Sequence, residues 1–595
     1  MRVGWADFDA YLGDAVYDVI IRGGFVVDGT GGAGAIADIG ITDGLIVEVA
    51  PSIDASAGAG EVIDATGLVV TPGFVDIHTH YDGQATWDEV LDPTSGHGVT
   101  TVVMGNCGVG FAPVRPGQEE WLVQLMEGVE DIPGTALHEG ITWQWESFPE
   151  YLDALGARRF SIDVAAYVGH GPVRAYVMGE RGARNEPATA DDIAEMGRLV
   201  REAIDAGAIG FSTSRTLNHK ARDGEPVPGT FAAMDELDGI ADAMVAAGRG
   251  VFEVAPQGLE FDAPVFMSEV EWMSRLAGRT GLAVTFAMLQ NALNADSWRD
   301  ALDVVDRTNA AGGHLRPQVA ARPFGMMLGW GGYHFFSKRP TYVELAARLS
   351  HEELVAELLT PAVRAAILAE TDLPADPAAQ FDGIGEFLQG MLESIYQMGS
   401  PPDYEPPPER TVAALAAVDG VEPIEKAYDL MCEDGGRAFL MLPFFNFVGG
   451  TQDAIHDMLV HPATISGLSD GGAHCRMICD ASIPTYLITH WARDRSRGPK
   501  LGLEQVVKMQ TADTAELVGM TDRGTIEPGR RADLNVIDLD RLTLGFPRAV
   551  DDLPAGGRRL LQDATGYVVT MVAGEVTRRD GADTGARPGR LVRSG

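Results

Sequence analysis

The sequence is poor in cysteine, in basic residues and in long apolar runs. Its 595 residues include four cysteines, too few for a disulfide-held scaffold in a chain of this length. Lysine and arginine number 45 against 86 acidic residues, giving a formal net charge of −41. This charge disfavours nucleic acids and anionic membranes as partners. No segment reaches the ~18 apolar residues that a membrane-spanning helix needs.

The beginning of the chain also lacks the features of a secretory signal. MRVGWADFDAYLGDAVYD contains acidic residues and no long apolar run. We therefore expect a cytoplasmic protein. Hydrophobic residues make up 45% of the sequence and charged residues 22%, a balance typical of a globular enzyme with a sizeable core.

Short β-type runs dominate the middle of the chain, and helical patterns separate several of them. The helical patterns include residues 194–207 and 235–248. Such alternation is typical of a (β/α)8 barrel, in which functional residues follow the carboxyl ends of the strands. The eight predicted strands lie in FVDIHTH, VTTVVMGN, SIDVAAYVG, GAIGFSTS, GVFEVAP, LAVTFAML, LRPQVAAR and ATISGLSD.

Both ends of the chain are rich in short strands with turn signals. Residues 19–27 are apolar and β-branched, and Asp43-Gly44 is a two-residue hairpin signal. The sequence thus predicts an α/β protein with a TIM barrel at residues 71–515. Residues 1–70 and 516–595 together are predicted to form a small β-sandwich domain. An insertion at about residues 324–447 is either a lid over the active face or padding without a catalytic role.

Candidate metal ligands follow the first and the last predicted barrel strand. His78 and His80 are separated by one residue, so the alternation of an extended chain places both side chains on one face. Imidazoles in this arrangement suit zinc or a similar ion. Asp470, in TISGLSDGGAH, can both bind a metal and accept a proton from the attacking water. An aspartate in a glycine-rich turn is common, but the position at the eighth strand favours a shared metal site.

Longer motifs resemble the amidohydrolase superfamily and, within it, the N-acyl-D-amino-acid deacylases. DATGLVVTPGFVDIHTHYD resembles the barrel entry of amidohydrolases, and GNCGVGFAP, YVGHGPVR and GLSDGGAH are similar to the deacylase branch. GRRADLNVID and VVTMVAGEVTRRDG resemble the closing strands, so the resemblance covers nearly the whole chain. It implies zinc, amide hydrolysis and a metal-ligating cysteine at Cys107. The alternative for Cys107 is a buried apolar role.

The fifth and sixth predicted strands depart from the pattern of these relatives. The relatives place a metal-binding histidine on each, whereas this sequence has Glu253 on the fifth and no histidine on the sixth. We therefore expect one divalent metal per chain, zinc or a similar ion. Glu253 could instead act as a general base, bind a substrate amine or form a salt bridge. The predicted metal ligands are His78, His80, Cys107, Glu253 and Asp470, with Asp470 also the catalytic base.

A deacylase of amino-acid derivatives needs a cation for the substrate carboxylate, which arginine binds well. Arg215 follows the fourth predicted strand and Arg322 the seventh. His170 lies within a motif that the resemblance covers. For each such residue a surface or core role is the alternative. The predicted substrate-binding residues are His170, Arg215, Arg322 and His474, with Arg174, His219 and Arg476 as further candidates.

These features predict a metal-dependent hydrolase of linear, non-peptide amide C–N bonds, with a small-molecule substrate. One alternative is a cyclic-amide hydrolase or deaminase on the same barrel. Cyclic-amide relatives use a carboxylated lysine, but GAIGFSTS has none and Lys220 is the nearest one after it. The other alternative is a non-catalytic binding protein, which the presence of the HTH, GNCG and SDGG motifs together disfavours. A homo-oligomer is compatible with the sequence.

Overall fold

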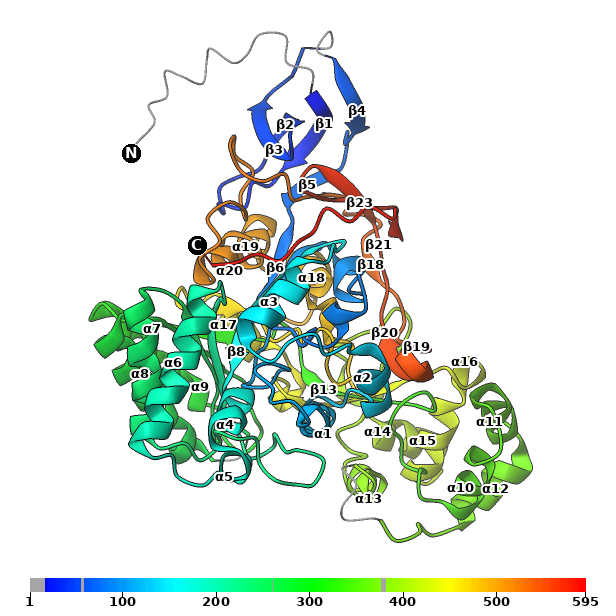
Figure 1. The fold of residues 1–595 in the computed structure, drawn as a ribbon. Coiled ribbons are helices and arrows are strands. Elements are labelled where there is room, and N and C mark those ends of the chain that lie inside the picture. The colour runs from blue at the N-terminus through cyan, green and yellow to red at the C-terminus, as the bar shows by residue number, and fades with distance from the viewer. Residues whose placement is uncertain (1–16, 55–57, 261, 376–380, 595) are drawn as a thin grey trace, which may run out of the picture.

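An eight-stranded parallel sheet forms the centre of the molecule (Figure 1). The computed structural model describes residues 17–54, 58–260, 262–375 and 381–594. The strands neighbour one another in the order in which they follow along the chain, and each overlaps one of the predicted strands. They are β6 (Phe74–Asp76), β7 (Val99–Met104), β8 (Asp163–Gly169), β9 (Gly210–Ser214), β10 (Val251–Ala255), β11 (Ala283–Ala287), β12 (His314–Val319) and β16 (Ile465–Ser466).

The first and last strands of this sheet are joined just beyond their carboxyl ends. Thr79 and Gly471 form a parallel bridge. The Asp470 amide donates to the His78 carbonyl at 3.1 Å, and the His80 amide donates to the Gly471 carbonyl at 2.8 Å. The sheet therefore closes into the predicted (β/α)8 barrel. This closure brings together the two segments that carry the candidate ligands.

Helices between the strands cover the outside of the barrel. In α6 (Ala190–Asp205), Met196, Val200 and Ile204 recur at helical spacing and are buried, and Thr189 caps the helix through a capping box with Asp192. The other helices outside the insertion are α1 (Glu119–Glu130), α2 (Gly134–Gly140), α3 (Phe148–Gly156), α4 (His170–Met178), α5 (Glu180–Ala183), α7 (Met234–Ala247), α8 (Ala263–Thr280), α9 (Ser297–Ala310), α17 (Asp453–Leu459), α18 (Ile483–Tyr486), α19 (Leu503–Met509) and α20 (Ala512–Leu517).

Strands from both ends of the chain form a second, nine-stranded sheet, which confirms their predicted joint fold. N-terminal β5 pairs with C-terminal β17 in this sheet. Asp43 and Gly44, with φ of 51° and 75°, make the predicted hairpin turn between β2 and β3. The strands are β1 (Tyr17–Val26), β2 (Ala35–Thr42), β3 (Leu45–Ala50), β4 (Ala59–Asp64), β5 (Val69–Pro72), β17 (Leu534–Ile537), β22 (Tyr567–Val572), β23 (Glu575–Arg579) and β24 (Ala582–Asp583). Two short antiparallel pairs join β18 (Thr543–Leu544) to β21 (Ala564–Thr565) and β19 (Arg548–Leu553) to β20 (Gly557–Leu561).

The long segment between β12 and β16 has a small sheet and a core of its own. β13 (Phe324–Leu328) pairs with β15 (Leu440–Phe445), which also pairs with β14 (Tyr396–Gln397). Trp330, Phe336 and Tyr428 are among the buried residues of this core. Figure 1 shows the helices of the segment grouped beside the barrel. They are α10 (Pro340–Ala346), α11 (His351–Leu358), α12 (Pro361–Ala369), α13 (Ile384–Gln389), α14 (Val412–Asp419), α15 (Pro423–Met431) and α16 (Glu433–Gly436).

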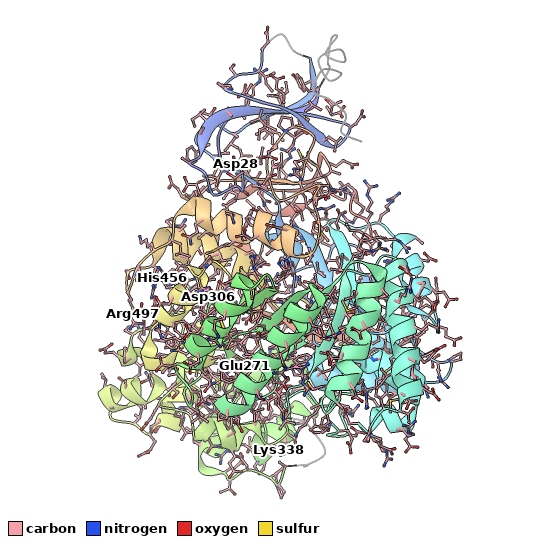
Figure 2. All side chains as sticks on the ribbon, turned by 90° about the vertical axis from the view of Figure 1, so that its left-hand side faces the viewer. Asp28, Glu271, Asp306, Lys338, His456 and Arg497 are labelled. Carbon is pink, nitrogen blue, oxygen red and sulfur yellow. The ribbon has the colours of Figure 1, made fainter. Side chains whose placement is uncertain are left out.

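Part of the acidic excess lies at the surface in exposed ion pairs. Glu271 and Asp306, labelled in Figure 2, lie 3.5 Å from Arg307 and 3.4 Å from His461. Such exposed pairs contribute little to stability. Among the described residues, no helix is long and apolar enough to cross a membrane.

Candidate metal centre

Two histidines converge on one carboxylate at the mouth of the barrel. His78 and His80 follow β6 and are 1% and 2% exposed. The Nε2 atoms of His78 and His80 lie 3.4 and 3.5 Å from the same oxygen, Oδ1 of Asp470. Asp470 follows β16 and has a φ of 48°. The residues predicted at the ends of the first and last strands therefore lie together.

The other ring nitrogen of each histidine faces a polar partner. His78 Nδ1 lies 3.0 Å from Oε1 of Gln318, at the end of β12. His80 Nδ1 lies 3.3 Å from Oε1 of Glu130, at the end of α1. An acceptor beside Nδ1 favours a proton there and leaves Nε2 free to bind a metal. Both Nε2 atoms thus face Asp470.

Cys107 and Glu253 extend this cluster from β7 and β10. Cys107 Sγ lies 3.5 Å from His78 Nε2, and the Cys107 amide donates to Glu253 Oε2 at 3.0 Å. The ligand atoms of His78, His80 and Cys107 all lie within 4.8 Å of one another. The structure therefore groups possible ligand atoms of His78, His80 and Cys107, with Asp470 facing the two histidines and Glu253 at the Cys107 amide.

Burial raises the pKa of several acidic groups in the cluster, because the nearby positive charges do not offset the loss of solvent. It raises the pKa of Glu253 to about 8, and it raises the pKa of Glu130 and of the Cys107 thiol. Burial also lowers the pKa of His78 to about 4. For His80, burial alone would lower the pKa, but the carboxylates of Glu130 and Asp470 outweigh it and raise the pKa to about 9. A dication at this position would stabilise the thiolate and carboxylate forms.

Unpartnered buried atoms show that the cluster fits a cation. Glu253 Oε1 is buried and makes no hydrogen bond, and Glu130 Oε1 and His80 Nδ1 face each other at 3.3 Å without forming one. Buried polar atoms are normally paired, so such a concentration needs a reason. Histidine nitrogen, thiolate sulfur and carboxylate oxygen are the ligand types that zinc takes in proteins. These residues therefore suit a zinc-like ion.

Two of the predicted substrate-binding residues, His170 and Arg215, are already bound by other side chains of the protein. Both ring nitrogens of His170 are engaged, by Thr213 Oγ1 and Glu236 Oε1, each at 2.9 Å. Arg215 is buried against Glu269, with Nε donating at 2.6 Å. The structure does not bring these two to the cluster with free polar atoms.

Arg322 is likewise committed to the protein interior. Its Nη2 donates to Asp480 Oδ1 at 2.6 Å, and its guanidinium lies 4.1 Å from the centre of the Tyr404 ring. The further candidate Arg174 is bound by Glu236 in the same way. The carboxylate partner balances the buried guanidinium, so Arg322 is not free to bind a substrate carboxylate.

His474 differs because it lies at the cluster and is partly exposed. Its Nε2 lies 3.7 Å from Glu130 Oε2, and 20% of its side chain is accessible. His219 is nearby in electrostatic terms, because the charges of His474 and His80 contribute to lowering its pKa to about 3, after burial as the largest cause. His474 is thus placed to meet a substrate.

Glu130 and Gln318 were missed by the sequence analysis. Glu130 ends a helix inserted after β7, and Gln318 lies in a run of mixed polarity within β12. Neither residue belongs to a motif, and each acts through one histidine nitrogen. Only the folded arrangement reveals these contacts.

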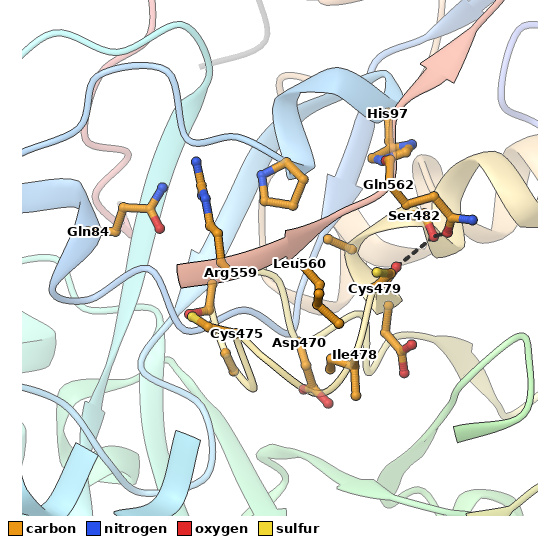
Figure 3. A pocket seen from close by; sticks show the side chains of 15 residues that line it. Gln84, His97, Asp470, Cys475, Ile478, Cys479, Ser482, Arg559, Leu560 and Gln562 are labelled. Atoms are coloured by element: carbon orange, nitrogen blue, oxygen red, sulfur yellow. Dashed lines mark hydrogen bonds between the residues drawn. The ribbon is translucent and has the colours of Figure 1, made fainter. Parts of the chain in front are cut away.

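A small cavity adjoins Asp470 on the side of the C-terminal strands (Figure 3). Its volume is about 20 Å³, room for a single water molecule and not for an N-acyl amino acid. The two free cysteines Cys475 and Cys479 are buried in its wall. Ser482 donates to Gln562 Oε1 at 2.7 Å on its far side. A substrate must therefore approach the cluster from another direction.

Comparisons with known proteins identify the family of the chain. The model of the amidohydrolase family matches residues 61–578. An uncharacterized protein of Mycobacterium tuberculosis is 29% identical over 100% of this chain and 98% of its own length. A D-aminoacylase of Alcaligenes xylosoxydans xylosoxydans is 34% identical over 44% of this chain and 51% of its own length. A solved D-aminoacylase structure, concerned with a binuclear metal centre, has a TM-score of 0.63 and 23% identity, covering 97% of this chain and 100% of that one.

Proposed function

The chain belongs to the amidohydrolase family, in its D-aminoacylase-like branch, and from this premise we propose that it is an N-acyl-D-amino-acid deacylase with a single metal. Membership makes it a hydrolase of carbon–nitrogen bonds other than peptide bonds. One observation carries the proposal. Two histidines aim Nε2 at one oxygen of Asp470, at 3.4 and 3.5 Å, with the Cys107 sulfur beside them.

We propose that one zinc-like ion per chain would be held by His78, His80 and Cys107. Asp470 and Glu253 would complete the ligand set. When bound, such an ion polarises the amide carbonyl and makes water more acidic. The number follows from β10 and β11, since the first contributes Glu253 and the second contains no histidine. The solved D-aminoacylase is described by one-metal activation and second-metal attenuation, which supports a working single-metal site.

Asp470 is the proposed acid–base residue. Burial would raise its pKa, but His80 and His78 outweigh this effect and hold the pKa below its usual range. The carboxylate is therefore ionised at neutral pH and able to accept a proton from the attacking water. When the carbon–nitrogen bond breaks, Asp470 returns that proton to the leaving nitrogen. Its backbone hydrogen bond to the His78 carbonyl fixes the side chain beside both histidines.

Arg476 is the proposed anchor for the substrate carboxylate. Its side chain is 46% exposed, and Nη2 donates to Asp131 Oδ1 at 3.0 Å. Asp131 directly follows Glu130, which faces His80. The guanidinium of Arg476 is thus a partly exposed positive charge near the cluster. Arg215 and Arg322, in contrast, are buried against carboxylates. We retain His474 as a residue that orients the substrate.

Hydrolysis of matched enantiomers tests this function. Zinc-loaded protein is incubated with N-acetyl-D- and N-acetyl-L-amino acids and with a cyclic amide, and the release of free amine is measured. The proposal expects release from the linear D substrates above all others. Preferential opening of the cyclic amide, or no release from any linear N-acyl-D-amino acid, would contradict it.

A further inference from the structure

A larger, apolar cavity lies between the long insertion and the segment that follows Asp470. Its volume is about 400 Å³, within the range of small-molecule sites. Apolar side chains and one glycine line it, and no lining side chain carries a charge. The side chains are Met326, Phe381, Ile384, Phe387, Phe444 and Met477. Such a lining suits a hydrocarbon or aromatic group and rejects a charged one.

Backbone hydrogen bonds connect this cavity to the metal centre. The Met477 amide donates to the His474 carbonyl at 2.8 Å, so these residues lie across a single turn. His474 in turn faces Glu130, the partner of His80. On the other side, the Met327 amide of β13 donates to the Met477 carbonyl at 2.7 Å. The cavity wall is therefore attached to the segment that carries Asp470 and His474.

A cation stands next to the apolar wall. Arg476 directly precedes Met477, and its guanidinium lies 5.0 Å from the centre of the Tyr333 ring. The Tyr333 ring packs against Phe381 at 5.3 Å, and the Tyr333 hydroxyl donates to Asp131 at 2.9 Å. Apolar and cationic features thus meet at Tyr333, whose partner Asp131 directly follows Glu130 of the cluster.

The cavity presents apolar surface that nothing in the described residues covers. Phe387 of α13 is 49% exposed although it stacks on Phe444 of β15, with ring centres 6.0 Å apart. Exposed apolar surface that lies together in a hollow usually marks a binding site. Its attachment, through Met477, to the segment that carries Asp470 and His474 points to a substrate group as the occupant.

We propose that this cavity receives a large apolar group of the substrate while Arg476 binds the carboxylate. The inference rests on the proposed deacylase function and narrows it to N-acyl amino acids with a bulky aliphatic or aromatic group. That group is either the acyl chain or the amino-acid side chain, because both attach close to the scissile amide. The insertion then determines specificity and is more than padding.

Two substrate series distinguish these sources. One varies the acyl group of D-alanine from acetyl to octanoyl, and the other varies the side chain of N-acetyl-D-amino acids from alanine to phenylalanine. We expect kcat/KM to rise along one series in the wild type. Phe387 and Phe444 belong to two different elements. Phe387→Ala and Phe444→Ala should each reduce that rise roughly tenfold, with little change in kcat/KM for N-acetyl-D-alanine. The series that loses its preference identifies the group in the cavity.

Val418→Ala is the control, because Val418 belongs to the same insertion, on α14, and is 83% exposed. It should behave as the wild type. If Phe387→Ala and Phe444→Ala hydrolyse N-acetyl-D-alanine normally and retain the wild-type preference in both series, the inference is overturned. If the wild type hydrolyses no member of either series, the deacylase proposal fails. The apolar site is then tested separately, by calorimetric binding of octanoate and of N-acetyl-D-phenylalanine. Weaker binding of either probe to Phe387→Ala than to Val418→Ala supports the apolar site, and equal binding of both rejects it.

Discussion

At the scale of single residues, Gln318 and Glu130 face the Nδ1 atoms of the two histidines. They lie 3.0 Å from His78 Nδ1 and 3.3 Å from His80 Nδ1. Partners of this kind orient metal ligands without binding the metal themselves. The hydrogen bond to Gln318 favours a proton on His78 Nδ1, and Glu130 faces the corresponding nitrogen of His80.

Removing either partner should weaken metal binding without unfolding the protein. We expect Gln318→Leu and Glu130→Gln to lower zinc affinity about 10–100-fold, measured by competition with a chromogenic chelator. Gln510→Leu is the control, because Gln510 is buried and its amide atoms make no hydrogen bond. Wild-type zinc affinity in both test variants would show that these contacts do not position the histidines.

Asp470→Asn separates catalysis from metal binding. The amide keeps the shape of the side chain but cannot accept a proton from water. We expect kcat per bound zinc to fall by about 10²–10⁴-fold, with zinc content measured on the same sample so that lost metal binding is separated from the lost proton acceptor. Asp306→Asn, at an exposed position, is the control for the same chemical change. Full activity in Asp470→Asn would remove its acid–base role.

The site could be predicted only where a residue belongs to a motif at a strand end. His78, His80 and Asp470 met this condition, and the closed barrel brings them together. Arg215 and Arg322 follow strands as well, but Glu269 and Asp480 neutralise them. Those partners are 54 and 158 positions away along the chain. Sequence order alone does not identify such long-range neighbours.

At the scale of elements, Glu405 ties the proline-rich part of the insertion to the helical segment Leu487–Asp494 and the residue after it. Glu405 accepts hydrogen bonds from Arg495 at 3.1 and 3.2 Å and lies 3.3 Å from His490. Burial alone would raise the pKa of Glu405, but His490 and Arg495 outweigh it and lower the pKa to about 2. The ionised carboxylate therefore stabilises the folded protein.

The contribution of Glu405 should depend on pH in one direction. Because its folded-state pKa lies below that of the unfolded chain, the stabilisation is complete above about pH 4.5 and is lost as pH falls toward 2. We expect Glu405→Gln to lower the free energy of unfolding by about 3 kcal/mol at pH 7. Urea denaturation should show the gap between variant and wild type narrowing below about pH 4.5. A gap that widens on acidification would contradict this sign.

Strands were predictable because each barrel strand is a short apolar run that needs little beyond itself to be identified. Even β16, two residues long, ends the apolar run ATIS before the glycine-rich turn. The insertion could not be predicted in detail, because β13 and β15 pair across more than 100 residues of mixed character. Its apolar cavity exists only after that pairing has formed.

At the scale of the whole molecule, the two ends of the chain meet in one sheet and the barrel closes between them. The pairing of β5 with β17 places the entry to and exit from the barrel side by side. We propose the domain division given by residues 1–70, 71–515 and 516–595, with the insertion at about 324–447.

The central claim is a single metal held by the two histidines and Cys107, and elemental analysis tests it most directly. Wild type is compared with His78→Ala/His80→Ala after zinc loading and removal of free metal. His138→Ala/His314→Ala, which removes two exposed histidines, is the control. The account predicts about one equivalent of zinc in the wild type and the control, and loss of that equivalent in the test variant. Two equivalents in the wild type, none after reconstitution, or one retained without His78 and His80 would contradict it.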